Sequence, residues 1–386
     1  MSFIPYGRQL ISQDDIDAVA EVLRGDFLTQ GPKVGEFERG VSDAVGASHA
    51  VACNSGTSAL HIACLALGLG EGDYLWTSPN SFVASANCAR YCGASVDFVD
   101  IDLHTGNMDV NRLQEKLIHA RQHGKLPKVV VPVHFAGQPC EMAEIGRLAQ
   151  EYGFYVIEDA SHALGAQYHG APVGSSQYSD ITVFSFHPVK IITSGEGGMA
   201  VTNNPVFAEK MRLFVSHGIT KDPEHLSQND GPWYYEQQEL GFNYRMTDIH
   251  AALGVSQLTR LGEWVARRNQ LAEHYHDLLQ SLPVTPLEVI SQVISSYHLY
   301  VIRLDLNEIK IGRRQLVERL RGQGIGVQIH YIPIHTQPYY SKLGFSKGDF
   351  PVAEQYYQEA LSLPLFPAMS EEDLDRVAVA LKSSIN

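Results

Sequence analysis

The chain has 386 residues, more than a single hydrophobic core usually serves, so we expect two domains. Its 43 acidic and 29 basic residues give a formal net charge of −14, which disfavours nucleic acid and anionic membranes as partners. No uncharged apolar stretch approaches the roughly 20 residues of a membrane-spanning helix, and the N-terminus lacks the apolar core of a secretion signal. We therefore expect a soluble protein with a small-molecule or protein partner.

The five cysteines lie in the first half of the chain and include no C-x-x-C pair. This pattern predicts neither a disulfide framework nor a zinc site, and it fits a reducing cytoplasm. The histidines at 104, 134, 187 and 217 also lack metal-ligand spacing, so we expect no metal site.

The first half of the chain has the pattern of an α/β protein. Ser12 and Asp15 mark the start of an amphipathic helix, and Gly25 marks its end. From residue 50 onward, short apolar runs alternate with segments long enough for a helix. The runs are AVAC (50–53), YLWT (74–77), SVDFV (95–99), KVVVPV (128–133), FYVIE (154–158), ITVFSF (181–186) and MAVT (199–202). This rhythm predicts a mostly parallel sheet, in which ligands bind beyond the carboxyl ends of the strands.

The second half predicts a long loop and then a smaller domain. Segment 221–238 is polar and irregular but carries Trp233, Tyr234 and Tyr235, so it closes over a ligand, meets a partner subunit or is disordered. Beyond it we expect helices at 247–261, 263–279 and 313–324 and strands at 297–304 and 327–335. We therefore expect a large α/β domain over 1–260 and a small α+β domain over 261–386.

Two adjacent carboxylates, Glu158 and Asp159, end one apolar run. Side-chain alternation along a strand can send only one of them into a site. A helix cap is the plain alternative. The functional interpretation is an acid that keeps a pyridine nitrogen protonated, which requires a lysine nearby.

Lys190, in FSFHPVKIITSGEGG (184–198), is the candidate for that lysine. A single lysine is usually a solvated surface group. This one follows a buried-type strand and lies between apolar residues, where burial lowers the pKa toward the neutral amine that a Schiff base requires. Gly195, Gly197 and Gly198 permit a tight backbone behind it.

A third candidate is CNSGTSALHIACLAL (53–67), where a strand runs through Gly56 into a helix. The helix start and the hydroxyls of Thr57 and Ser58 suit an anion, although an ordinary N-cap gives the same pattern. Ser185 could bind the same phosphate. Phe82 is either a core residue or a ring that stacks on the pyridine.

In chain order, NSGTSAL, EDASHALG, FSFHPVKIITSGEGG, SHGI and GFNYRMTDIHAALG resemble the DegT/DnrJ/EryC1/StrS family of sugar aminotransferases, which have the fold type I architecture. The resemblance runs from Tyr6 to about Pro367. It implies a homodimer with shared active sites and pyridoxal 5'-phosphate (PLP) held by Lys190 as a Schiff base. It further implies the following roles: Asp159 on the pyridine nitrogen, His162 on the phenolic oxygen where the family often has glutamine, Phe82 on the ring, Thr57, Ser58 and Ser185 on the phosphate, Asn243 on the phosphate from the other subunit, and Arg245 on a nucleotide diphosphate.

SHALG, FSFH, NYRM and VQIHYIPIH are most similar to the branch of the family that serves pseudaminic acid synthesis. That branch moves an amino group from L-glutamate to C4 of a UDP-linked 4-keto-6-deoxy-N-acetyl-hexosamine. The implied sugar contacts are Tyr6, Asp26, Phe27, Leu28, Thr29, Gly56, His330 and Tyr331. Another nucleotide sugar of the family remains the alternative.

Three other functions fit the sequence less well. A dehydratase of the family has histidine in place of the Schiff-base lysine, which Lys190 contradicts. A noncatalytic regulator normally carries a DNA-binding module, and the first 50 residues show neither basic charge nor a helix-turn-helix pattern. The run GLGEG (68–72) suggests a dinucleotide site, but it follows a helix rather than a strand.

Overall fold

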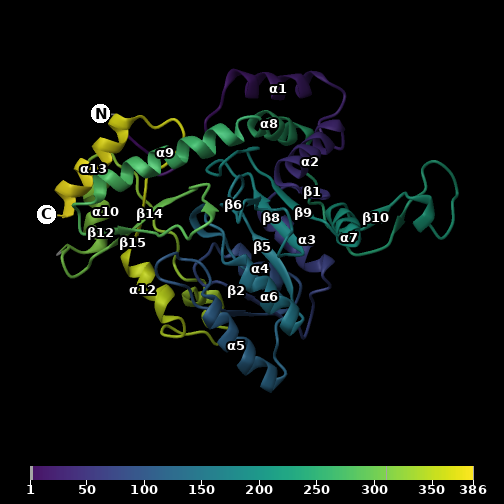
Figure 1. Cartoon of the computed structure of the whole chain (residues 1–386). Coiled ribbons are helices and arrows are strands. Elements are labelled where there is room, and N and C mark those ends of the chain that lie inside the picture. The colour runs from purple at the N-terminus through teal and green to yellow at the C-terminus, as the bar shows by residue number, and fades with distance from the viewer. Residues whose placement is uncertain (1–2, 310, 386) are drawn as a thin grey trace.

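The computed structural model describes residues 3–309 and 311–385 and is built around a seven-stranded sheet (Figure 1). The strand order is β1–β9–β8–β5–β4–β2–β3. Neighbours from β8 to β3 run parallel, and β9 is antiparallel to both β8 and β1. The strands are β1 (His49–Cys53), β2 (Tyr74–Thr77), β3 (Ser95–Phe98), β4 (Val129–Val131), β5 (Tyr155–Asp159), β8 (Ile181–Ser185) and β9 (Gly198–Thr202). Each corresponds to one predicted apolar run, so the mostly parallel α/β sheet is confirmed.

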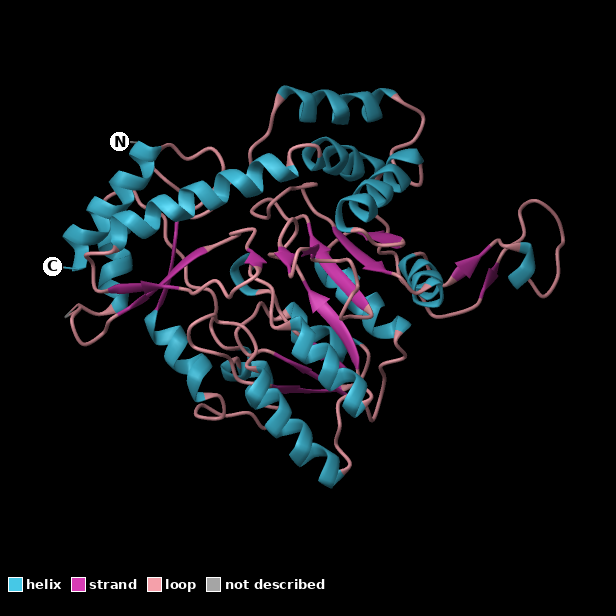
Figure 2. Ribbon diagram, in the orientation of Figure 1, coloured by secondary structure: helices cyan, strands magenta, loops and turns pink. Residues whose placement is uncertain are grey.

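Helices cover both faces of this sheet (Figure 2). Alternate residues of β1 show the division, because Val51 and Cys53 pack in the core with α3 whereas Ala50 and Ala52 pack with α2. The first face carries α3 (Gly56–Ala66), α4 (Ala84–Tyr91) and α7 (Pro205–Val215). The second carries α2 (Pro32–Val45), α5 (Val110–His123), α6 (Met142–Tyr152) and α8 (Asp248–Leu258). The result is three layers with the strand ends left open for a site.

The predicted N-terminal helix is α1 (Gln13–Arg24). Ser12 and Asp15 form a reciprocal capping box, and Gly25 caps the other end. The Asp15 carboxylate is fully buried, and it also accepts hydrogen bonds from Ser256 and Arg260 at 2.7 and 2.6 Å. One acid therefore caps α1 and joins it to α8.

The C-terminal part has a core of its own. It contains α9 (Leu261–Leu279), α10 (Arg313–Gly322), α13 (Glu371–Ile385) and the antiparallel sheet of β12 (Val284–Pro286), β14 (Tyr300–Leu304) and β15 (Ala360–Leu363). Ile4, from the opposite end of the chain, packs in this core. We propose that these elements form the smaller α+β domain and that it begins near residue 260. In the described part of the chain, no helix is both long enough and apolar enough to cross a membrane.

Several short elements lie outside these helices and the two main sheets. They are β6 (Gln167–Tyr168), β7 (Ala171–Pro172), β13 (Val293–Ile294), α11 (Pro338–Ser341) and α12 (Pro351–Glu359), with 3-10 turns at Phe135–Gly137, Pro223–His225 and Ile334–Thr336. Strands β13, β6 and β7 form a small antiparallel sheet.

The predicted strand at 327–335 is wrong. The segment is irregular, with a single bridge between Gln328 and Ser362. Its backbone is held elsewhere, because the Tyr331 N–H donates to Asn80 and the Ile334 N–H donates to the Pro79 carbonyl. Adjacent side chains at 330 and 331 both face the same cavity, which the alternation of a regular strand does not allow.

Segment 221–238 lies in an arm that projects from the molecule (Figures 1 and 2). Two short antiparallel strands, β10 (Ile219–Thr220) and β11 (Glu236–Gln237), form its base. The Trp233 side chain is 72% exposed and Tyr235 is 54% exposed. The structure therefore shows an arm with two exposed aromatic rings, and the predicted alternatives for its role stay open.

The buried pair His134–Glu158 connects two strands of the sheet. His134 Nε2 lies 2.6 Å from the Glu158 carboxylate, which also accepts hydrogen bonds from Ser179 and Thr182. The Cys140 N–H donates to His134 Nδ1 at 3.1 Å, so this nitrogen carries no proton and the ring donates its Nε2–H to Glu158. Burial would raise the pKa of Glu158, but the hydrogen bonds from His134, Ser179 and Thr182 outweigh it and lower that pKa. Glu158 is therefore a buried carboxylate held by three donors, one of which is a neutral imidazole.

Replacing Glu158 with Gln removes the charged acceptor of three buried hydrogen bonds, from His134, Ser179 and Thr182. We expect the free energy of unfolding in urea to fall by about 2 kcal/mol. The matched control is Glu318→Gln, since Arg314 and Glu318 form an ion pair in which both side chains are mostly exposed. That change should cost under about 0.5 kcal/mol. Equal small losses for the two variants would show that the charge of the buried Glu158 carboxylate does not stabilise the fold.

Candidate active site

A cavity of about 840 Å³ lies beyond the carboxyl ends of β1, β5 and β8. Parallel strands bring the residues that follow them to one edge of the sheet, which is where ligands bind in such folds. Most of the predicted site residues line this cavity. They are Tyr6, Gly56, Thr57, Ser58, Phe82, Asp159, His162, Ser185, Lys190, His330 and Tyr331.

Asp159 is the carboxylate that β5 directs into the cavity, while Glu158 faces the other side of the sheet. The Asp159 side chain is buried, and its Oδ2 accepts a 2.6 Å hydrogen bond from the Ser85 hydroxyl. Its Oδ1 accepts one from the Ser161 N–H at 3.1 Å. Each oxygen keeps a free lone pair for a ligand in the cavity.

Lys190 lies in the connection from β8 to β9. Its neighbour Ile191 is buried, and its own N–H donates to the His187 carbonyl. Burial lowers the pKa of Lys190 to about 8, although the Asp159 charge acts in the opposite direction. A substantial fraction of this amine is therefore neutral near physiological pH, as a nucleophilic amine requires.

The start of α3 forms a cradle for an anion. Ser55 caps the helix by accepting a hydrogen bond from the Ser58 N–H. The Ser58 hydroxyl is bonded to Asn54 at 2.6 Å, and Thr57 lines the cavity beside it. A Cβ on Gly56 would lie 3.0 Å from the Ser185 Cβ, so glycine lets the two segments approach closely. The helix dipole and these polar groups suit a phosphate.

Histidine and tyrosine rings form the opposite wall. His162 Nε2 lies 3.1 Å from the Tyr331 hydroxyl, and its ring packs on His298 with centroids 4.3 Å apart. Burial, followed by the Lys190 charge, holds the pKa of His162 well below its usual value, so its imidazole is neutral. Its buried Nδ1 has no hydrogen-bond partner in the described chain.

Six predicted contact residues do not line this cavity: Asp26, Phe27, Leu28, Thr29, Asn243 and Arg245. The first four are exposed in the connection from α1 to α2. The Asn243 carbonyl lies 3.5 Å from the Asn54 amide, so its segment adjoins the cradle, and Arg245 donates to Ser216. The structure contains one chain, so the predicted roles of these six residues stay predictions.

The sequence analysis missed several residues at or beside the cavity. Asn54, Ser55, His250 and His298 line it, and Ser85 holds Asp159 from α4. Asn54 could have been found, because it stands directly between the apolar run and the glycine of the cradle. His298 interrupts an apolar strand pattern, which is a weak sign of function. Nothing in the sequence marks Ser85.

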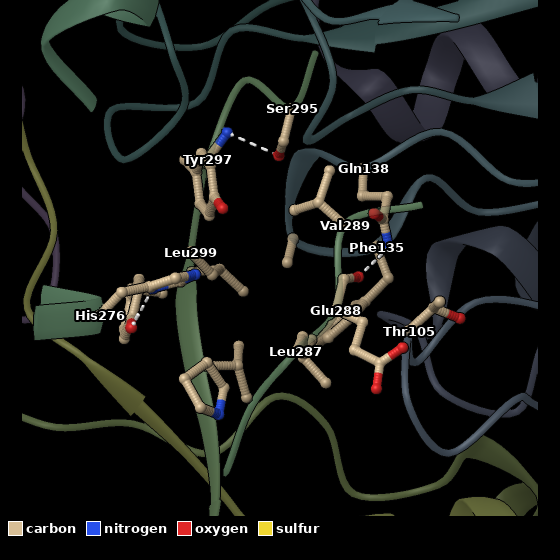
Figure 3. A pocket seen from close by; sticks show the side chains of 14 residues that line it. Thr105, Phe135, Gln138, His276, Leu287, Glu288, Val289, Ser295, Tyr297 and Leu299 are labelled. Carbon is tan, nitrogen blue, oxygen red and sulfur yellow. Dashed lines mark hydrogen bonds between the residues drawn. The ribbon is translucent and has the colours of Figure 1, made fainter. Parts of the chain in front are cut away.

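A second cavity, of about 20 Å³, lies between loop 135–138 and segment 286–301 (Figure 3). Phe135, Leu287 and Leu299 line it, and the Gln138 amide donates to the Glu288 carbonyl beside it at 2.8 Å. This space holds about one water molecule, so it is no substrate site. Among residues 3–309 and 311–385, no group of three or more His, Cys, Asp or Glu is arranged to hold a metal ion.

The large cavity offers a partner for each of three groups of PLP: the aldehyde, the pyridine nitrogen and the phosphate. The amine of Lys190 can capture an aldehyde, the Asp159 carboxylate can hold a protonated pyridine nitrogen, and the α3 start can bind the phosphate. These three groups project from separate segments of the large sheet toward one space. The class that the fold and cavity define is therefore a PLP-dependent enzyme of fold type I.

Comparison with known proteins agrees with that class. Residues 9–382 match the DegT/DnrJ/EryC1/StrS aminotransferase family. The chain is 40% identical to the spore coat polysaccharide biosynthesis protein SpsC of Bacillus subtilis, over 99% of this chain and 97% of SpsC. Its structure resembles Helicobacter pylori PseC, an aminotransferase involved in the biosynthesis of pseudoaminic acid, with a TM-score of 0.90, 32% identity and coverage of 100% and 99%. It also resembles the PLP form of Streptococcus pneumoniae Spr1654, assigned as a sugar aminotransferase, with a TM-score of 0.89, 28% identity and coverage of 99% and 98%.

The chain belongs to the DegT/DnrJ/EryC1/StrS aminotransferase family. It is a sugar aminotransferase that depends on PLP, and Spr1654 has been solved with both the PLP and the PMP form of that cofactor. The predicted family, fold type and cofactor are thereby confirmed.

The lowered pKa of Lys190 predicts how cofactor-free protein captures PLP. Only the neutral amine reacts, so the rate constant should rise with pH and reach half its maximum near pH 8. Because the Asp159 charge stabilises the ammonium form, Asp159→Asn should move this midpoint to lower pH. Stopped-flow absorbance measures the rate. The exposed Lys210 provides the control, and Lys210→Ala should leave the profile unchanged. A midpoint near about 10.4, as in free lysine, would contradict the burial of the amine.

Proposed function

We propose that the protein transfers an amino group from L-glutamate to C4 of a UDP-linked 4-keto-6-deoxy-N-acetyl-hexosamine, as in pseudaminic acid synthesis. The observation that carries this proposal is the whole-length likeness to PseC, at 32% identity. The placement of Tyr6, Gly56, His330 and Tyr331 around the cavity that holds Lys190 supports it.

Lys190 is the proposed catalytic residue. When bound, PLP supplies an electron sink that stabilises a carbanion next to the reacting nitrogen. The Lys190 amine, with a pKa near 8, can then take the proton from the α-carbon of glutamate and later deliver a proton to C4 of the sugar. A group with a pKa near the working pH suits both directions.

Other residues of the cavity bind and orient. We assign the pyridine nitrogen to Asp159, whose carboxylate is fixed by Ser85 and Ser161. We assign the phosphate to Thr57, Ser58 and Ser185, the phenolic oxygen to His162, and the open face of the ring to Phe82. Phe82 is 58% exposed and is not one of the buried core residues, so its ring is available to stack on the cofactor.

The sugar subsite is assigned to Tyr6, His330 and Tyr331. Burial lowers the pKa of His330 to about 3, and its Nδ1 is bonded to Ser362 at 2.8 Å. A neutral imidazole and two phenols offer hydrogen bonds to hydroxyls without adding charge. Such groups suit a hexose better than an amino-acid carboxylate.

We further propose a homodimer in which each chain completes the other's site. Asp26–Thr29, Asn243 and Arg245 lie outside the cavity of their own chain, and a second chain can present them. The exposed aromatic arm at 221–238 is a candidate for the same contact. Arg245 would then meet the nucleotide diphosphate. The five free cysteines support a cytoplasmic location.

The alternative substrate is another nucleotide-linked keto-sugar. The observation in its favour is the identity to SpsC, a spore coat polysaccharide biosynthesis protein, which is higher than the identity to PseC. The amino-group transfer and its residues are the same in that case, and only the sugar contacts differ.

The visible absorbance of purified holoenzyme tests the function. The band of bound PLP should bleach with L-glutamate and return when the UDP-linked 4-keto-6-deoxy-N-acetyl-hexosamine is added. A dTDP-4-keto-6-deoxyglucose sample serves as comparison. Return with that sugar alone would overturn the proposed substrate but leave the class intact. Lys190→Ala should lower turnover by at least about 10³-fold while noncovalent PLP binding persists. Lys210→Ala should behave like the natural protein.

Mixed dimers test the shared site. Lys190→Ala and Asn243→Ala homodimers should each be impaired, because each lacks one component at both sites. Equal mixing after subunit exchange gives heterodimers with one intact site, so activity should recover to about a quarter of the natural level. Mixing Lys190→Ala with Asp159→Ala is the control. Each of these changes damages the cavity of the chain that carries it, so both sites of the heterodimer lack one component and no activity should be recovered. If the mixture of Lys190→Ala and Asn243→Ala recovers no activity, Asn243 does not contribute to the site across the interface.

A further inference from the structure

Two buried serine hydroxyls and the Asp159 carboxylate form a continuous chain of hydrogen bonds. The hydroxyl oxygens of Ser81 and Ser85 lie 2.7 Å apart, and the Ser85 hydroxyl lies 2.6 Å from Asp159 Oδ2. All three side chains are buried, with 3%, 0% and 4% of the surfaces of Ser81, Ser85 and Asp159 exposed. Ser81 lines the large cavity, and Ser85 connects it to Asp159. The chain thus begins at the cavity wall and ends at a carboxylate of the same cavity.

A hydroxyl has one hydrogen to donate, and this fixes the direction of the chain. The Ser85 hydroxyl has two acceptors in range, the Asp159 carboxylate at 2.6 Å and the Phe82 carbonyl at 3.3 Å. The shorter bond to a charged oxygen is the stronger one, so Ser85 donates to Asp159. Ser85 then has no hydrogen left for Ser81, and Ser81 must donate to Ser85. Both hydroxyl hydrogens therefore point along the chain toward the carboxylate.

Serines near the start of a helix ordinarily cap it, but these two do not. Helix α4 begins after Val83, and within the described chain no side chain makes a capping bond to its first turn. Ser81 precedes the helix, Ser85 lies in its first turn, and the spacing of four residues brings the two hydroxyls together. The two hydroxyls therefore serve Asp159 rather than the helix.

Donors reach both oxygens of Asp159. Besides the Ser85 hydroxyl on Oδ2, the Ser161 N–H donates to Oδ1 at 3.1 Å. Hydrogen bonds to the charged form of a carboxylate favour that form over the protonated one. A carboxylate with donors on both oxygens is therefore a weak competitor for a proton that lies between it and a pyridine nitrogen.

We propose that Ser81 and Ser85 are positioning residues that act through Asp159 to keep a proton on the pyridine nitrogen of the cofactor. Ser85 holds the carboxylate directly, and Ser81 strengthens that bond by donating to the Ser85 oxygen. A protonated nitrogen makes the PLP ring a better electron sink, so the two serines support amino transfer to any sugar. This inference rests on the proposed placement of Asp159 at the pyridine nitrogen, and it is independent of the sugar's identity.

Nitrogen-15 NMR of holoenzyme loaded with PLP labelled at the ring nitrogen tests the proposal, because the chemical shift distinguishes a protonated from a neutral nitrogen. In the natural protein, this nitrogen should carry its proton at neutral pH. In Ser85→Ala, the pH at which the nitrogen loses that proton should fall by about one unit, because a hydrogen bond to a charged group is lost. Ser81→Ala should lower that pH by less, since Ser85 still donates to Asp159.

The double variant distinguishes a chain of two hydroxyls from two separate effects. Because Ser81 acts through Ser85, Ser81→Ala should add no further shift to a protein that already carries Ser85→Ala. Ser384→Ala is the matched control, since Ser384 is fully buried in α13 and its hydroxyl accepts one hydrogen bond, from Gln323. That change should leave the nitrogen signal as it is in the natural protein.

Asp159→Asn separates failure of this inference from failure of the Asp159 assignment. If Asp159→Asn leaves the nitrogen protonated, the placement of Asp159 is wrong and the role of the serines is wrong with it. If Asp159→Asn yields a neutral nitrogen while Ser85→Ala and Ser81→Ala change nothing, only the role of the serines is overturned. Additive shifts in the double variant would also overturn it. Should Ser85→Ala fail to fold, the absence of any shift in Ser81→Ala decides against the proposal.

Discussion

Side-chain alternation at the end of β5 is the constraint on which the site depends. Glu158 and Asp159 are neighbours in the chain, yet the pleat sends them to opposite faces of the sheet. Glu158 accepts hydrogen bonds from the His134 imidazole and two hydroxyls, and becomes part of the structural core. Asp159 faces the cavity, where its charge also acts on Lys190. A register shift of one residue would exchange these environments, so that Glu158 faced the cavity and Asp159 faced His134.

Much of the large domain could be predicted because its strands are continuous apolar runs. Strands buried on both faces require such runs, so all seven appear plainly in the sequence. The sequence also indicated Lys190 by its position after a strand and among apolar residues, and it indicated Asp159 by alternation. The assignment of the other roles came from resemblance to a family, since a serine or a phenylalanine near a strand end has many ordinary uses.

Other features depend on contacts between distant segments, which no local pattern shows. Segment 327–335 alternates like a strand, but its backbone is bonded to the loop at Pro79 and Asn80. Ser85 reaches Asp159 across 74 residues of sequence. The residues at 26–29, 243 and 245 were inferred from the family, and a single chain's pattern does not tell which subunit they serve.

The N-terminal segment has a consequence for how the protein is made. The Ile4 N–H and carbonyl are bonded to Gly324 and Gly326, and the Tyr6 carbonyl accepts from Leu365. These partners are translated only after β9, the last strand of the large sheet along the chain, which ends at residue 202. Tyr6 is translated before that sheet, yet it takes up its position in the cavity only once residue 365 is available. Assembly of the cavity therefore waits for the C-terminal part, even where the large sheet folds during translation.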